Sequence, residues 1–92
     1  MARKADERVN LDVMPRFYFH LHNDIDASDE GGKELPDLDA ARSCAISMAR
    51  CEVAEAATRD GRIVLSRRID IEDENGAVLA TVHFRDAVKV AP

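Results

Sequence analysis

Residues 37–59 are the one stretch of this 92-residue chain whose pattern is typical of a long helix. Asp37 follows Pro36 as a favourable N-cap, and Gly61 is a favourable residue to end the helix, with Arg59 in its last turn. Apolar residues recur at helical spacing along one side, and half of them are alanine. Because these side chains are small, we expect the helix to lie close against a sheet. The residues on this side are Leu38, Ala41, Ala45, Ile46, Met48, Ala49, Val53 and Ala56.

The segment before the helix contains one clear strand. Residues 16–22, RFYFHLH, alternate so that Phe17, Phe19 and Leu21 share one face, which is typical of a half-buried strand. Residues 23–34 have the composition of a loop, with a glycine pair as its breaker. A short second strand near residues 33–35 is an option that the pattern leaves open.

The segment after the helix predicts a hairpin. Residues 63–72 and 77–84 are apolar runs on either side of Asn75-Gly76, a strong turn signal. A loop of two or four residues would give an even register, which we favour, and a three-residue loop would give an odd one. In the even register the face of Ile69 and Ile71 also carries Val78, Ala80, Val82 and Phe84. In the odd register it carries Leu79, Thr81 and His83 instead.

These elements predict an α+β fold with the order β-(β)-α-β-β. One α-helix would pack on a small antiparallel sheet of three or four strands. A chain of this length has room for a single domain, which we expect over residues 14–86. Residues 1–13 are expected to be a disordered or extension segment, with Met14 as an alternative start, and residues 87–92 a frayed tail.

From Met14 onward the sequence resembles a small bacterial family, a domain of unknown function. The family pattern starts with M-P-R-Y-F-F-H-L, here residues 14–21, and opens its helix with E-L-P-D-L-x-A-A-R, here residues 34–42. Its hairpin contains D-E-x-G, here residues 73–76. The resemblance implies a bacterial domain, but it implies no activity and no catalytic residues.

Composition narrows the function further. The formal net charge of −5 disfavours nucleic acid and anionic membranes as main partners. No apolar run approaches the ~18 residues of a membrane span, and the first residues lack the apolar core of a signal peptide, so we expect a cytoplasmic protein. Neither cysteine has a base predicted beside it, and no phosphate-binding glycine loop occurs. We therefore expect no enzyme activity and no cofactor.

The outward face of the first strand carries polar residues that could bind a ligand. His20 and His22 lie two apart on it, and the even register adds His83, so a zinc site is conceivable if the three converge. Solvent-facing histidines on an open sheet are the favoured interpretation. Tyr18 and Arg68 on the same exposed face could instead stack on and pair with nucleic acid. The acidic residues within 24–39 oppose that alternative.

The helix suggests two further contacts. Arg42 projects on the apolar side, so either its stem lies along the sheet edge with its head in water, or it pairs with a carboxylate of the acidic loop as a structural ion pair, which we favour. A stripe of small residues on the other side could meet the same stripe of a second copy; it comprises Ala40, Cys44, Ser47, Cys51, Ala54 and Thr58. The leading hypothesis is an interaction or regulatory module that forms a homodimer and binds a protein partner. The alternative is a nucleic-acid-binding or metal-binding domain that uses the exposed sheet face.

Overall fold

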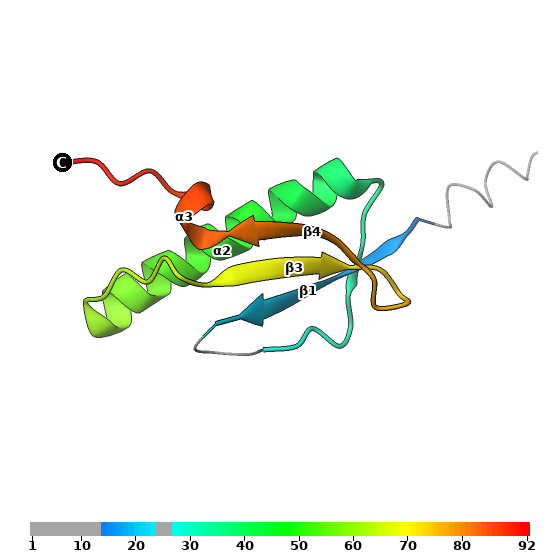
Figure 1. The fold of residues 1–92 in the computed structure, drawn as a ribbon, viewed down its shortest axis with the longest axis horizontal. Coiled ribbons are helices and arrows are strands. Elements are labelled where there is room, and N and C mark those ends of the chain that lie inside the picture. The colour runs from blue at the N-terminus through cyan, green and yellow to red at the C-terminus, as the bar shows by residue number, and fades with distance from the viewer. Residues whose placement is uncertain (1–13, 24–26) are drawn as a thin grey trace, which may run out of the picture.

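The computed structural model describes residues 14–23 and 27–92, so the expectation for residues 1–13 lies outside the described part. The elements follow in the order β1 (Arg16–His22), β2 (Lys33–Glu34), α2 (Leu38–Asp60), β3 (Arg68–Glu72), β4 (Val78–His83) and α3 (Phe84–Ala87). The strands form one antiparallel sheet with the order β2-β1-β3-β4. α2 lies across one face of this sheet (Figure 1). The predicted α+β class and element order are confirmed, with the optional second strand present.

Both ends of α2 are set by the residues that the sequence indicates. Asp37 is the N-cap, and its Oδ1 accepts a hydrogen bond from the Ala40 N–H at 2.8 Å. Gly61 takes the left-handed conformation, with φ 68°, and its N–H reaches the last turn of the helix. None of the helices in the described part combines the length and the apolar character of a membrane span.

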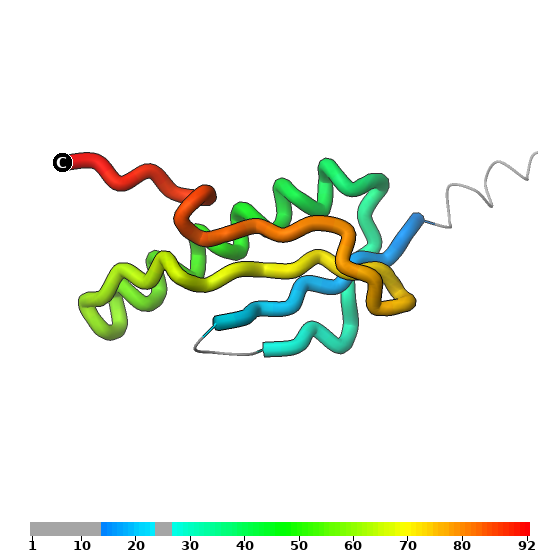
Figure 2. Tube along the Cα trace, in the orientation of Figure 1, coloured from blue at the N-terminus to red at the C-terminus, as the bar shows by residue number. Residues whose placement is uncertain are grey.

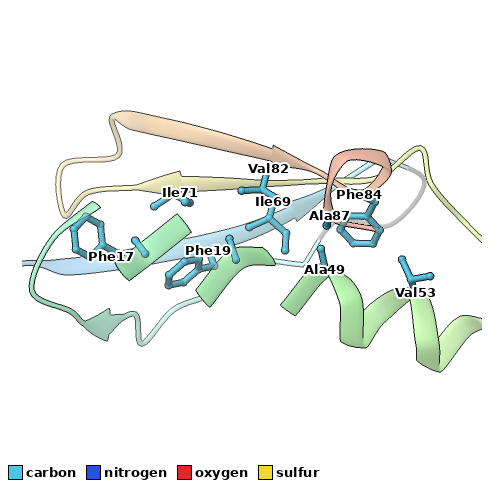
Figure 3. Packing of buried hydrophobic residues seen from close by; sticks show 11 residues of the cluster. Phe17, Phe19, Ala49, Val53, Ile69, Ile71, Val82, Phe84 and Ala87 are labelled. Atoms are coloured by element: carbon cyan, nitrogen blue, oxygen red, sulfur yellow. The ribbon is translucent and has the colours of Figure 1, made fainter. Parts of the chain in front are cut away.

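The core lies between α2 and the inner face of the sheet (Figure 3). Phe17 and Phe19 of β1 lie beside Ile69 and Ile71 of the neighbouring strand β3, on the face of the sheet turned toward α2 (Figure 3). The helix contributes mainly alanines, so its backbone approaches the sheet closely. The buried helix residues are Ala41, Ala45, Ala49, Val53 and Ala56, all from the predicted apolar side. Leu38 and Ile46 of that side are half-buried, and Met48 is exposed.

The turn between β3 and β4 differs from the predicted loop. The Asp73 N–H donates to the Ala77 carbonyl at 3.0 Å, which encloses residues 74–76. Gly76 has φ 84° and its N–H donates back to the Asp73 carbonyl at 3.1 Å. The expectation of a two- or four-residue loop is therefore wrong, because the hairpin closes over three residues with a left-handed glycine.

The even register is nevertheless confirmed along the core, because a β-bulge compensates for the loop. Ile71 pairs with Ala80, whereas the next residue, Glu72, pairs with Val78, so Leu79 is the extra residue of β4. The bulge returns Ala80 to the isoleucine face, as predicted. Val78 does not reach that face, and it is 54% exposed.

The end of the chain also differs in part from the expectation of a frayed tail over residues 87–92, because Ala87 is buried. Residues Phe84–Ala87 form the short helix α3, and both its first and last residues are buried. Val88 packs partly against the core, whereas residues 89–92 are exposed. A four-residue segment shows no period in the sequence, and contacts with α2 stabilise it instead. Figure 2 shows the last residues leading away from the domain after this turn.

Candidate interaction surfaces

The outer face of the sheet, turned away from α2, brings together the polar residues that the sequence nominates. Tyr18, His20 and His22 lie along β1, and Arg68 on β3 pairs directly with His22. Their side chains therefore form one exposed to half-buried patch across the two central strands. This placement agrees with the alternation of RFYFHLH.

Two carboxylates that sequence reasoning did not nominate, Asp70 and Glu72 of β3, lie in this patch beside the histidines. Asp70 is 8% exposed, and its Oδ2 lies 3.4 Å from His22 Nε2. Its Oδ1 accepts hydrogen bonds from the Thr81 hydroxyl at 2.9 Å and from Arg68 Nε at 3.3 Å. The signal was available, because the alternation of RIDIE in β3 places Asp70 on the same face as the histidines.

His20 has contacts at both ring nitrogens. Its Nε2 lies 3.5 Å from Glu72 Oε1, and its Nδ1 accepts a hydrogen bond from the Asp29 N–H at 3.2 Å. The Asp29 carboxylate in turn accepts from the Phe19 N–H at 3.2 Å and from the Gly32 N–H at 3.0 Å. These bonds hold the loop against β1, so His20 contributes to local structure.

The structure does not support the zinc site that the three histidines left as an option beside the favoured solvent-facing placement. His83 of β4 and His22 of β1 stand on opposite sides of Arg68, which pairs with both. The Arg68 guanidinium, which donates to Asp70 and Asn23, adds a positive charge to this face that opposes the binding of a cation. Within residues 14–23 and 27–92, no three His, Cys, Asp or Glu side chains are placed to hold a metal ion.

Arg42 lies beside the β4 edge of the sheet. It is exposed and lines a groove of about 230 Å³, together with Ile46, Thr81, Val82, His83 and Asp86. In the described part of the chain, no ion pair joins Arg42 to the loop that precedes α2. The sheet ends at β4, so this position can reach water although it shares a helical side with buried residues.

The stripe of small residues on α2 is split between two environments. Ala40 and Cys44 are half-buried, and Cys44 packs against the core cluster. The remaining members, Ser47, Cys51, Ala54 and Thr58, are exposed. Both cysteines are free thiols. The four exposed members are thus available as a contact surface.

The two edges of the sheet have different characters, which sequence reasoning did not bring out. β2 forms one edge with only two residues, both charged, and β4 forms the other with six residues and no Asp, Glu, Lys or Arg. On β4, Val78 is 54% and Leu79 is 41% exposed. A short charged edge resists pairing with another chain, whereas a long uncharged edge offers its main-chain groups to a further strand.

One protein-family model, described as "Domain of unknown function (DUF6894)", matches residues 16–85. The match runs from β1 into α3 and so includes the whole sheet and α2. No curated protein and no solved structure matches the chain.

Proposed function

The chain belongs to the DUF6894 family of domains of unknown function, and on that premise we propose that it is a non-catalytic protein-interaction module that works as a homodimer. The observation that carries this proposal is the β4 edge. It is long and uncharged, and it exposes two large apolar side chains, Val78 and Leu79. Edges of this kind favour association with another chain.

The arrangement of the polar residues supports a structural role for the outer face. Asp70 and Glu72 engage His22 and His20, and Asp29 holds the loop against β1. These titratable groups therefore stabilise the sheet, and the surface left for function is its edge. A small domain also buries a limited share of its apolar surface, and dimerisation increases that share.

The oligomeric state tests this proposal directly. Sedimentation velocity of the full chain over a wide range of concentration should give a species of twice the 10.2 kDa chain mass. The population of this species should rise with concentration, as mass action requires. A monomer at every concentration would contradict the homodimer.

The alternative function is nucleic-acid binding on the outer face, favoured by the common placement of Tyr18, His20, His22 and Arg68. The carboxylates of Asp70 and Glu72 in the same patch weaken its attraction for phosphates. Fluorescence anisotropy with a single-stranded RNA oligonucleotide distinguishes the two functions. Salt-sensitive binding that Tyr18→Ala abolishes would favour the alternative, and no binding at low salt would exclude it.

A further inference from the structure

We infer that β4 pairs antiparallel with β4 of a second copy about a two-fold axis at Thr81, so that two sheets become one continuous sheet. The inference rests on the proposed homodimer and assigns its surface. It places the contact at the sheet edge, and not on the small-residue stripe of α2.

The hydrogen-bond pattern at the end of β4 shows which main-chain groups are available. The Phe84 N–H donates to the Arg67 carbonyl at 3.0 Å, just beyond the ladder between β3 and β4. In an antiparallel ladder, residues alternate between those that bond to the neighbouring strand and those that point away. Counting back from Phe84, Val82 bonds toward β3, so Thr81 and His83 direct their N–H and C=O groups to the open edge.

This pattern suits a symmetric contact. With the two-fold axis at Thr81, the outward N–H and C=O groups of Thr81 face those of the partner's Thr81. His83 then comes opposite the partner's Leu79, the bulge residue at which the regular ladder ends. The pairing brings no like charges opposite each other, because β4 has no Asp, Glu, Lys or Arg and its one histidine comes opposite a leucine. It also covers Leu79, whose side chain is 41% exposed, and removes apolar surface from water.

The groove beside the edge adds charge complementarity. Arg42 and Asp86 are both exposed and both line this groove, on the helix side of β4. Each copy therefore presents a cation and an anion beside the proposed contact between the two β4 strands. Two such mixed-charge grooves attract each other when a two-fold axis reverses one against the other.

Two substitutions at Thr81 test the inference with a matched control. Thr81→Val and Thr81→Lys both lose the hydrogen bond to Asp70, but only the lysine brings two like charges together at the axis. Sedimentation should show a Thr81→Val dimer like the wild type. It should show at least about a tenfold higher dissociation constant for Thr81→Lys. Thermal melting checks that both variants fold.

Hydrogen exchange provides a second measurement that does not depend on a variant. The amide N–H groups of Thr81 and His83 should be protected at concentrations where the dimer forms and should exchange quickly in the monomer. Ser47→Arg, on the α2 stripe, should leave the dimer intact. A Thr81→Lys protein that dimerises like the wild type overturns the inference but leaves the homodimer standing. A wild type that stays monomeric overturns the homodimer itself.

Discussion

Arg50 of α2 donates a hydrogen bond from its Nε to the main-chain carbonyl oxygen of Ala87, at 2.7 Å and across 37 positions of sequence. Ala87 is the last residue of α3, where a helix leaves its carbonyl groups without partners of its own. The cationic side chain satisfies one of these groups. This bond stabilises the packing of α3 against α2. It thereby helps to hold Phe84, the first residue of α3, in its fully buried position in the core.

Replacing Arg50 with Met should therefore destabilise the domain while keeping most of the apolar stem. The loss should be about 1 kcal/mol, because the bond involves a charged donor but is only part-buried. For a domain of this size, the melting temperature should fall by roughly 4–8 °C. Arg59→Met is the control, because the Arg59 ion pair with Asp60 is exposed and should contribute little. Equal losses in both variants would contradict a special role for Arg50.

Gly32→Ala should destabilise the protein far more than Gly31→Ala. Gly32 has φ 68°, and a Cβ there would come within 2.8 Å of both Arg16 Cγ and a ring carbon of Tyr18. Strain of this kind costs about 1–3 kcal/mol. Gly31 has open space around its Cβ position, so its alanine variant should be nearly neutral. Urea titration of both variants measures the difference, and similar midpoints would contradict the close packing of Tyr18 over Gly32.

The parts of the fold that the sequence predicts are those governed by local signals. The caps at Asp37 and Gly61 mark both ends of α2, and the alternation of RFYFHLH gives the faces of β1 correctly. The turn signal Asn75-Gly76 predicts the hairpin, and the favoured even register is present along the core, although the loop has three residues and not two or four. That register depends on a bulge at Leu79, whose advantage is to return Ala80 to the core. The position of the bulge follows from the packing of Ala80 against the core, and the local sequence does not encode that packing.

The parts that the sequence misses depend on contacts between distant residues. α3 has four residues and is held by Arg50, so no local period could reveal it. The helical angle of Arg42 predicts its side of α2 but not where the sheet ends, so it does not decide between an ion pair and a water-exposed position at the sheet edge. The open edge at β4 likewise follows from strand order, which periodicity does not determine.

Asp70→Ala should destabilise the sheet more than Glu72→Ala. Asp70 is almost buried and accepts from the Thr81 hydroxyl and Arg68, so its removal leaves these donors unsatisfied. The expected loss is about 1–3 kcal/mol. Glu72 contacts His20 at 3.5 Å and is more exposed, so its removal should cost less. Chemical denaturation of the two variants gives the comparison, and a neutral Asp70→Ala would show that the network contributes nothing.

Phe19→Ala should be among the most destabilising single changes in the chain. Phe19 is 5% exposed and belongs to the core cluster between β1 and α2. Truncation of a buried phenylalanine costs about 3–5 kcal/mol, which approaches the whole stability of a small domain. Phe19 also borders a pocket of about 300 Å³ between β1 and α2, so water can partly fill the enlarged space. We therefore expect a loss near the lower end of that range.

Two controls separate this loss from a general sensitivity to substitution. Phe19→Leu keeps most of the apolar volume and should cost less than about 1.5 kcal/mol. Ile63→Ala, at a side chain that is 60% exposed, should change stability by no more than about 0.5 kcal/mol. Urea unfolding followed by circular dichroism gives all three values. A Phe19→Ala loss below about 1 kcal/mol would mean that the inward face of β1 is assigned wrongly, because a core truncation cannot be that mild.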